Sequence, residues 1–390
     1  MKKEVFYKKL CTGCGLCKSI NTTPFMKDGN FECPSVRKED LNLLEKVCPA
    51  NAINFNESNI ENYEPWGKYI NFYKGYSLND DIRYKSASGG LITSILCYLL
   101  EHNYVDGVLQ VKSNGVLSSE LVCNTSATDV IKCSGSLYID TRPLEKINTY
   151  LNNGKKYAFV GKPCDIEALE NYEKKVLKGV TNIIYKLTFF CGGSPSVEAS
   201  KKVIESFGIS INDCTSIKYR GNGWPGKTII QGNEKQYSKE YIDSWNNYFG
   251  RDCRYICRFC LNGTGICGDI SCGDLWNLEN NVPVFKEQAG VNVVFSRSSK
   301  GENLLKEMND NGYIFLEDYS GNIDNLKYIQ PYQYNRRISI LPKIRALKLF
   351  CKPAPKYKMK NIILLNKQNF KRNVKTFLGT CKRIVKGNIK

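Results

Sequence analysis

The chain has 390 residues, 42% of them apolar and 24% charged, which are ordinary values for a globular protein. At roughly 150 residues per domain, two or three packed units are expected, which excludes a peptide module or a disordered tail. Cysteine is abundant, with 18 residues, whereas His102 is the single histidine. This excludes Ser/His triads and His-ligated zinc hydrolases and leaves thiol chemistry as the main resource.

The net charge of +18 belongs to the C-terminal part of the chain. After Asp324 there are 18 Lys+Arg and no acidic residue, so residues 1–324 hold 38 residues of each sign. A neutral body offers no basic groove to a polynucleotide, and nucleic acid is therefore not an expected partner.

The N-terminus carries charges without an apolar core, so it is not read as a secretory signal. The longest uncharged stretch, residues 86–100, has 15 residues, fewer than the roughly 20 that span a bilayer. The expected location is cytoplasmic, where clustered cysteines stay reduced and act as metal ligands rather than forming disulfides.

Cysteines recur through the first 60 residues, which predicts a small lobe whose fold is organised by cysteines that ligate a metal. Cys11, Cys14 and Cys17 form a C-x2-C-x2-C motif, and Cys48 follows 31 residues after the last of them. A tight loop that supplies three thiolates, with a remote Cys-Pro as the fourth, is typical of a 4Fe-4S cluster. Cys33, also followed by proline, competes with Cys48. Zinc, or three cysteines without any metal, are the alternatives.

From about Phe72 onward, apolar segments alternate between strand-like and helix-like patterns. The expected strands are 105–111, 157–161, 183–190, 291–295 and 313–316, and the expected helices are 91–100, 165–174 and 300–311. Ser194 and Pro195 are expected to begin another helix that Gly208 ends. The alternation predicts an α/β fold of mixed α+β character, with functional loops at the C-terminal ends of strands.

A second group of cysteines comprises Cys253, Cys257, Cys260, Cys267 and Cys272. Its irregular spacing is interpreted as a second iron-sulfur cluster, with a structural zinc or unliganded thiols as alternatives. Cys257 and Cys260 form the unambiguous pair, Cys253 is the preferred third ligand, and the fourth is left open.

Two further cysteines, Cys164 and Cys191, lie where strands are expected to end in turns that contain glycine. They either line a site or are simply small buried residues.

Several segments occur together in the order found in one family. They are the Cys11–Cys17 motif, residues 86–90, 161–164, 190–196 and 219–225, and Cys257-x2-Cys260 followed by residues 268–274. Over roughly residues 5–320 the chain resembles the coenzyme F420 hydrogenase/dehydrogenase beta-subunit family. The resemblance implies an iron-sulfur flavoprotein with FAD, one or two 4Fe-4S clusters, and a site where a deazaflavin or another acceptor exchanges hydride.

The resemblance also implies that Ser88, Gly89 and Gly90 lie near the flavin and that Lys162 and Cys164 belong to a loop beside it. A glycine turn that opens a helix presents backbone N–H groups to an anion such as a pyrophosphate. A plain helix cap without a ligand is the alternative.

The chain departs from many relatives in lacking a second cysteine triple in the N-terminal lobe, so one cluster is expected there. Where relatives often carry a histidine, it has Gly192, which removes any proton role of that histidine. Similar bacterial proteins look associated with surface polysaccharide synthesis, which argues against coenzyme F420 as the substrate.

The leading hypothesis is an iron-sulfur flavin oxidoreductase that passes electrons between 4Fe-4S clusters and FAD to an unidentified substrate. A ferredoxin, or a reduced deazaflavin or flavin, would be its redox partner. The alternatives are a non-catalytic electron-transfer subunit that serves a separate enzyme, a coenzyme F420-dependent reductase, and a zinc-stabilised scaffold protein.

Three domains are expected: a ferredoxin-like 4Fe-4S lobe at 1–60, an FAD and iron-sulfur body at 70–335, and a basic C-terminal tail at 336–390.

In this tail, residues 343–390 carry 15 Lys+Arg and no acidic residue. Phe370, Val374, Phe377 and Leu378 recur at helical spacing, which would make one helix face apolar. Peripheral contact with an anionic membrane fits this pattern. A solvated or partly disordered extension is the alternative.

Overall fold

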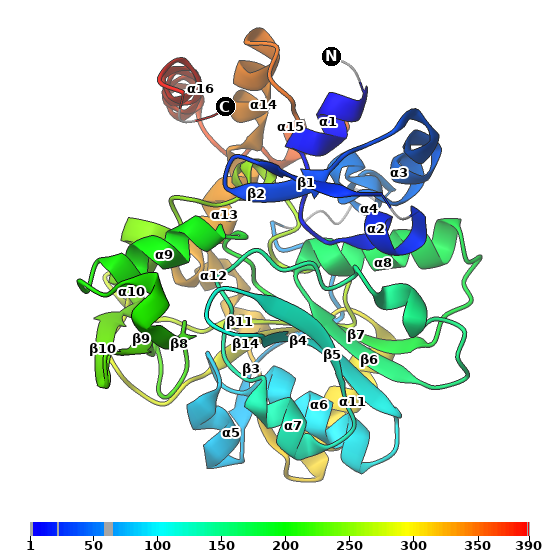
Figure 1. Cartoon of the computed structure of the whole chain (residues 1–390), viewed down its shortest axis with the longest axis vertical. Helices are drawn as coiled ribbons and strands as arrows, with labels where there is room; N and C mark the ends of the chain where they lie inside the picture. Colours follow the sequence, from blue (N-terminus) through cyan, green and yellow to red (C-terminus); the bar gives the residue numbers. More distant parts are fainter. Residues whose placement is uncertain (1–2, 22, 58–64, 388, 390) are drawn as a thin grey trace.

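A computed structural model gives the fold and describes residues 3–21, 23–57, 65–387 and 389 (Figure 1). An eight-stranded mixed sheet forms its centre. In sheet order the strands are β15 (Ile314–Asp318), β3 (Asn71–Ser77), β14 (Asn292–Ser296), β11 (Ile270–Asp274), β7 (Ile183–Phe189), β6 (Tyr157–Gly161), β4 (Gly107–Ser113) and β5 (Ser119–Asn124). Strands β3, β11, β7, β6 and β4 point the same way, and the other three are antiparallel to their neighbours.

Helices cover both faces of this sheet, as two successive side chains of β4 show. On β4, Val108 packs into the same apolar cluster as Leu91 of α6 (Leu91–Glu101) and Leu304 of α11 (Ser299–Asp310). The next residue, Leu109, joins a cluster on the opposite face with Ile166 of α8 (Pro163–Lys175). Because successive side chains point to opposite faces, the alternation follows directly from the strand geometry. The α/β fold class predicted from the sequence is confirmed.

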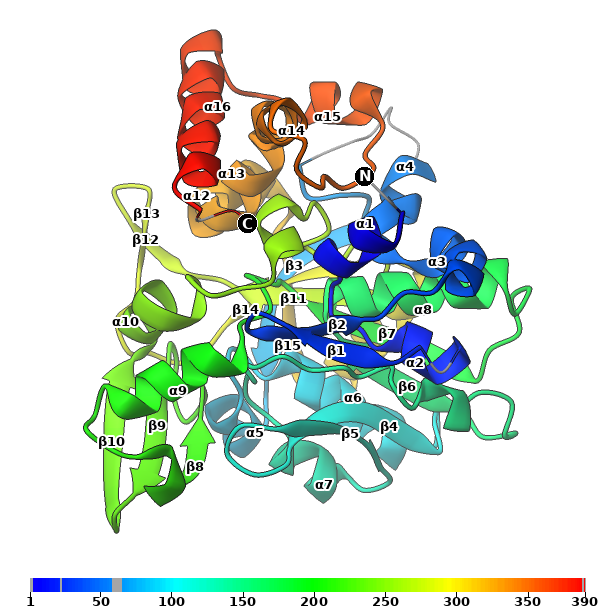
Figure 2. The same ribbon diagram turned by 45° about the horizontal axis from the view of Figure 1, so that its top comes forward.

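The N-terminal lobe consists of short elements that pack on α8 (Figure 2). They are α1 (Lys3–Lys9), α2 (Leu16–Asn21), β1 (Phe25–Asp28), β2 (Phe31–Pro34), α3 (Leu41–Val47) and α4 (Ile53–Glu57). Leu16 and Val47 belong to the same apolar cluster as Ile166 of α8, so the lobe and the sheet share a core.

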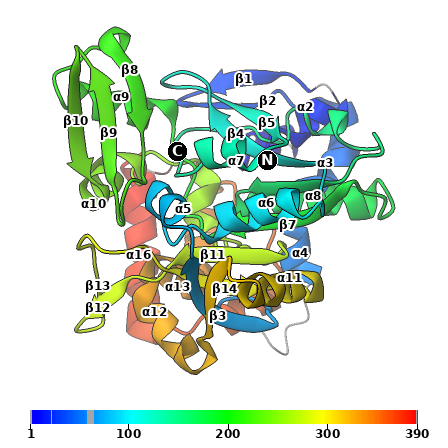
Figure 3. The same ribbon diagram turned by 90° about the horizontal axis from the view of Figure 1, so that it is seen from below.

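A smaller three-stranded sheet lies beside the main one (Figure 3). Its strands are β8 (Cys214–Lys218), β9 (Lys227–Gly232) and β10 (Lys235–Glu240). The short helix α10 (Tyr241–Ser244) follows, and further along the chain come the paired strands β12 (Asn277–Glu279) and β13 (Val282–Val284). The body also contains the helices α5 (Asp80–Lys85) and α7 (Ala127–Lys132).

The helix expected to begin at Ser194 and Pro195 begins later. α9 runs from Val197 to Glu205, and the Ser196 hydroxyl caps it by accepting from the Ala199 N–H at 3.1 Å. The Ser194 N–H instead donates to the Cys257 sulfur at 3.4 Å. A long-range contact therefore holds this residue outside the helix, and the predicted cap was wrong.

The basic tail is folded into helices rather than partly disordered, although much of its last helix is exposed to solvent. Its helices are α12 (Leu326–Ile329), α13 (Pro331–Ile338), α14 (Ile340–Leu349), α15 (Met359–Leu365) and α16 (Phe370–Val385). Buried residues of the last three helices, such as Leu347, Ile362 and Ile384, share a core with Phe55 and Phe259. Within the described residues, no helix is long and apolar enough to cross a membrane. The domain boundaries stay a prediction.

A buried carboxylate, Glu302 of α11, connects this helix to strand β3 of the sheet. Its Oε1 accepts hydrogen bonds from Tyr73 and Asn71, both at 2.7 Å, and pairs with Lys306 at 2.9 Å. Burial by itself would raise the pKa of Glu302, but hydrogen bonds from Ser296, Tyr73 and others outweigh it and bring the pKa from 4.5 to about 2.

We expect Glu302→Gln to lower the free energy of unfolding by about 2 kcal/mol at neutral pH. A lowered folded-state pKa contributes stability above the unfolded value of 4.5, and that contribution is lost as the pH falls toward about 2. Urea unfolding at pH 7 and below pH 4 measures the difference, which should shrink on acidification. The exposed Glu317→Gln is the control, and a pH-independent loss would contradict the charge argument.

Candidate functional site

The C-terminal ends of the parallel strands lie along one edge of the sheet, where ligands bind in α/β proteins. Cys164 follows β6 and sits in the first turn of α8, and Cys191 follows the neighbouring strand β7. Because β6 and β7 are adjacent and parallel, they bring these two cysteines to the same place.

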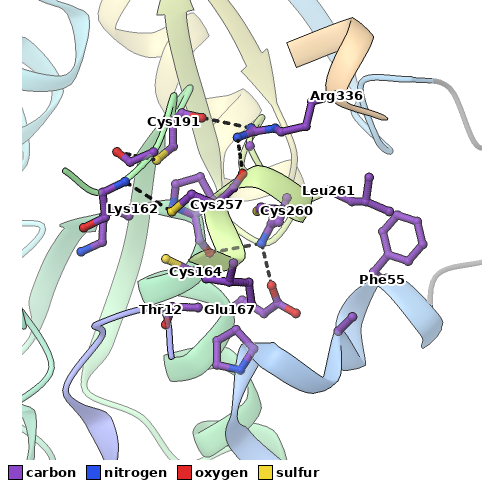
Figure 4. A pocket seen from close by; sticks show the side chains of 18 of the residues that line it. Thr12, Phe55, Lys162, Cys164, Glu167, Cys191, Cys257, Cys260, Leu261 and Arg336 are labelled. Carbon is purple, nitrogen blue, oxygen red and sulfur yellow. Dashed lines mark hydrogen bonds between the residues drawn. The ribbon is translucent and has the colours of Figure 1, made fainter. Parts of the chain in front are cut away.

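Four cysteines face one cavity at this edge, called here the body cavity (Figure 4). They are Cys164, Cys191, Cys257 and Cys260. The last two come from the short helical segment Tyr255–Phe259 and its end. The cavity measures about 630 Å³ when its open mouth is included. Three segments far apart in the sequence thus supply four thiols to a single space.

Two residues of α13, Arg336 and Gln333, form hydrogen bonds with backbone carbonyls in the wall of this cavity. Arg336 donates from Nη2 to the Cys191 carbonyl at 3.0 Å and from Nη1 to the Cys257 carbonyl at 3.3 Å. Gln333 donates to the Cys191 carbonyl at 2.9 Å. Arg336 is 5% exposed, and its hydrogen bonds go to carbonyl oxygens and an amide rather than to a carboxylate. The cavity wall therefore carries a buried positive charge.

A buried carboxylate, Glu167 of α8, also lines the body cavity. Its Oε2 accepts from the Asn262 amide at 2.9 Å. Burial raises the pKa of Glu167 to about 7, against the lowering effect of that hydrogen bond. Neither Glu167 nor Arg336 was expected at the site from the sequence, since no motif marks either of them.

The remaining cysteines of the second sequence group lie outside the body cavity. Cys253, predicted as the third ligand, points its thiol toward the Phe249 carbonyl at 3.2 Å and packs against Gly193. Cys272 is buried in the core of β11. Among the described residues, the cysteines that line the cavity are Cys164, Cys191, Cys257 and Cys260, and Cys253 lies close enough to Cys191 and Cys257 to interact with their charges.

The N-terminal motif forms a second cavity of about 400 Å³, called here the lobe cavity. Cys11, Cys14, Cys17 and Cys48 all line it, together with mostly apolar side chains. Gly13 supports the loop, because its φ is +76° and a Cβ there would lie 2.6 Å from the side chain of Arg254. The four cysteines predicted for the first cluster are thus brought together.

Cys33, the rival for the fourth position, lies beside Cys11 but outside the lining of the lobe cavity. Its sulfur accepts from Arg254 Nη1 at 3.5 Å. Arg254 is buried and pairs with Asp140, Nε to Oδ1, at 2.7 Å. Since Arg254 precedes the Cys257 segment in the chain and its side chain reaches the N-terminal lobe, it links the two cavities.

The two cavities adjoin, because Thr12 and Pro49 line both of them. Burial, followed by repulsion from neighbouring thiols, raises the pKa of Cys48 and of Cys191 to about 12. Such thiols lose their protons when a metal binds them, because the positive charge of the metal stabilises the thiolate that burial alone disfavours.

A single metal ion does not fit either arrangement. In the described part of the chain, no three His, Cys, Asp or Glu side chains converge closely enough to hold one ion. Tetrahedral zinc needs four sulfurs at about 2.3 Å from one point. A cubane cluster separates its thiolates more widely, since each binds a different iron. The donor set therefore fits a cluster better than zinc.

The five residues assigned to flavin by resemblance lie in two places on the same sheet edge. The Ser88 hydroxyl donates to the Val291 carbonyl at 3.1 Å, and a Cβ on Gly89 would meet Asn292 Oδ1 at 2.6 Å. Gly90, with φ +80°, begins α6. This turn is packed against β14, so its glycines serve the fold of the chain itself.

The other two, Lys162 and Cys164, lie where α8 begins, just after β6, and β6 is about four strand spacings, roughly 19 Å, from β3 in the sheet. Lys162 is buried, pairs with Asp165 at 2.8 Å and donates to the Thr141 hydroxyl at 2.9 Å. Cys164 belongs to the body cavity. The five residues therefore form two separate groups along this edge of the sheet.

A separate group of interacting side chains lies at the same edge of the main sheet, at the end of β11. Arg220 pairs with Asp274, Nη2 to Oδ1, at 2.7 Å, and the Trp224 indole donates to the same oxygen at 2.8 Å. Trp224 stacks on Trp276 with 4.7 Å between ring centroids. Arg220, Trp224 and Asp274 belong to the segments 219–225 and 268–274 singled out in the sequence, and the structure joins them.

The fold and the two cavities define an α/β protein with paired four-cysteine sites. Family models for the coenzyme F420 hydrogenase/dehydrogenase beta subunit match residues 72–147 (N-terminal part) and 154–321 (C-terminal part). The chain belongs to this family. The body cavity's cysteines lie within the matched C-terminal part, whereas the N-terminal lobe lies outside both models.

Two relatives from methanogens agree with this assignment. The F420-dependent formate dehydrogenase subunit beta of Methanocaldococcus jannaschii is 28% identical over 240 residues, 60% of this chain and 59% of that protein. A subunit of the F(420)H(2) dehydrogenase of Methanosarcina mazei is 22% identical over 79% of this chain and 84% of its own length. The chain spans less than two thirds of the first of these relatives.

A solved structure shows the same fold. It is the F420-reducing [NiFe] hydrogenase complex from Methanosarcina barkeri, in which one chain superposes with a TM-score of 0.57 at 17% identity, covering 75% of this chain and 97% of that one.

Proposed function

We propose that this chain is an electron-transfer oxidoreductase subunit that binds two 4Fe-4S clusters, one in each cavity. The body cavity carries the proposal, because four thiols from three segments face one space there. Cys164, Cys191, Cys257 and Cys260 would hold one cluster. The residues predicted from the sequence, Cys11, Cys14, Cys17 and Cys48, would hold the other. When bound, such clusters supply one-electron transfer.

The residues around the cavities suit this role. Arg336 places a buried cation against the backbone of Cys191 and Cys257, and a cation there favours the more negatively charged, reduced state of the site. The shared wall of Thr12 and Pro49 lets electrons pass between the sites without crossing solvent.

FAD stays a prediction that rests on the family resemblance. Ser88, Gly89 and Gly90 lie on the same sheet edge as Lys162 and Cys164 but in a separate group, and each group is engaged within the chain. Variants at Gly89 would disturb Asn292 of β14 and could not report on a flavin. Flavin content of the purified protein is the direct measurement.

The redox partner is proposed from the relatives, whose names specify coenzyme F420. A deazaflavin is the first candidate and a ferredoxin the second. The association with surface polysaccharide synthesis stays a prediction, since no described residue bears on it.

The deciding experiment is metal and flavin analysis of the full chain after anaerobic purification and reconstitution. We expect about eight iron and eight sulfide per chain, with paramagnetic signals on reduction by dithionite. Stoichiometric zinc without iron would contradict the proposal.

The second candidate, a non-catalytic electron-transfer subunit, is favoured by the two adjoining cysteine-lined cavities, which share the residues Thr12 and Pro49. Reduced coenzyme F420 and a viologen acceptor, supplied to the reconstituted chain, separate the two. Turnover by the isolated chain supports a catalytic subunit. Clusters that accept electrons from dithionite and pass them to the viologen, but that are not reduced by reduced F420, support the electron carrier.

A further inference from the structure

The last helix, α16, exposes its apolar side chains instead of burying them. Phe370 is 84% exposed, Val374 39%, Leu378 59% and Val385 73%. At about 100° per residue, these positions fall within a sector of about 80° on one side of the helix. They are called here the apolar stripe.

The helix is held to the protein by a different side. Thr380 and Ile384 are buried, and Ile384 shares an apolar core with Ile344 and Leu347 of α14. Figures 1 and 2 both show α16 at the outside of the molecule, next to α14. The apolar stripe therefore faces away from the core while the helix itself is anchored.

A row of lysines runs beside the apolar stripe. Lys371, Lys375, Lys382 and Lys386 are all exposed, and helical spacing places them within a sector of about 60° that adjoins the stripe. α16 contains no acidic residue, and neither does any part of the chain after Asp324. The C-terminal part of the sequence therefore supplies no acidic side chain that could neutralise these lysines.

Exposed apolar side chains are concentrated in the same part of the chain. Of the 20 large hydrophobic residues that are exposed among the described residues, nine lie between 349 and 385. Besides the apolar stripe, they are Leu349, Phe350, Met359, Ile363 and Leu364. Scattered exposed apolar residues need no explanation, but a concentration of this kind marks an interaction surface.

We infer that α16 is an interfacial helix that docks the protein on an anionic membrane surface, with the apolar stripe inserted among the lipids and the lysine row on their headgroups. Phenylalanine and leucine beside lysines are the composition of helices that lie in a membrane interface. A protein interface is an inferior fit, since lysine is depleted there. The inference does not depend on the clusters or on their assignment.

The test is co-sedimentation of the full, reconstituted chain with vesicles that contain about one third anionic phosphatidylglycerol in phosphatidylcholine. The apolar variant is Phe370→Ser with Leu378→Ser and Val385→Ser, and the charge variant is Lys371→Glu with Lys375→Glu and Lys382→Glu. All six positions are exposed, so folding is unaffected. Truncation is avoided, because it would uncover the core around Ile344 and Leu347.

We expect the parent chain to bind anionic vesicles and not neutral ones, and each variant to bind at least about tenfold more weakly. The control pair Val180→Ser and Val282→Ser, equally exposed on the body, should bind like the parent. Iron content should stay unchanged in all variants.

Three outcomes would overturn the inference. The parent chain binds no vesicles; the apolar variant binds as tightly as the parent; or the parent is a dimer that the apolar variant converts to a monomer without vesicle binding, which would make the stripe an interface between copies.

Discussion

Replacing Cys191 with alanine should remove about four iron and four sulfide per chain, half of what the reconstituted protein holds. The loop that follows β7 brings Cys191 into the body cavity with Cys164, Cys257 and Cys260. Loss of one of four thiolates leaves an iron without its protein ligand, and alanine cannot replace it as serine can. Iron and sulfide analysis after anaerobic reconstitution measures the loss.

Cys253→Ala is the matched control for this prediction. It removes a thiol from the same neighbourhood, close to Gly193, but one that points to the Phe249 carbonyl instead of the cavity. The control should retain both clusters. If Cys253→Ala lost four iron while Cys191→Ala kept them, the ligand set predicted from sequence spacing would be correct and the one drawn from the body cavity wrong.

Local sequence signals predicted five of the eight strands of the main sheet, and β3, β5 and β11 were not expected. The strand expected at 157–161 has the bounds Tyr157–Gly161, and the helix expected at 91–100 is Leu91–Glu101. Both carry apolar runs with glycine nearby, so local pattern and fold agree. The start of α9 was missed because Ser194 is engaged by Cys257, more than 60 residues later in the chain, and no local rule includes such a contact.

The candidate site was predictable only where its residues are close in sequence. The motif of Cys11, Cys14 and Cys17 contains three of the four donors in seven residues. In the body cavity, Cys164 and Cys191 meet the Cys257 segment only because β6, β7 and β11 are neighbours in the sheet. Spacing alone therefore pointed to Cys253, whereas the fold brings Cys164 and Cys191, which had been noted at strand ends, into the same cavity as Cys257 and Cys260.

The C-terminal tail also shows what local sequence patterns could and could not predict. Helical spacing identified Phe370, Val374, Phe377 and Leu378 as one apolar face; Phe370, Val374 and Leu378 are exposed on one side of α16, whereas Phe377 is partly buried. Sequence could not show whether this side faces the core, since that depends on which residues dock on α14. Thr380 and Ile384 take that place, which leaves the face exposed.

Replacing Cys48 with alanine should remove the other half of the iron, about four per chain, whereas Cys33→Ala should keep it. The two positions are matched, since each is a cysteine followed by proline in the N-terminal lobe. Cys48 ends α3, where its N–H donates to the Leu44 carbonyl at 3.0 Å, and it lines the lobe cavity with the Cys11–Cys17 motif. Cys33 faces Arg254 at 3.5 Å instead.

Electron paramagnetic spectra of the reduced variants identify which cluster is lost. Cys48→Ala and Cys191→Ala should each lose a different signal, and Cys33→Ala should keep both, with a shifted lobe signal at most, because Arg254 lies against Cys33 and the Gly13 loop alike. Loss of iron from Cys33→Ala with retention in Cys48→Ala would reassign the fourth ligand. Equal losses would mean that a collapse of the lobe, not ligation, explains both variants, because Cys33 and Cys48 lie on separate elements, β2 and the end of α3.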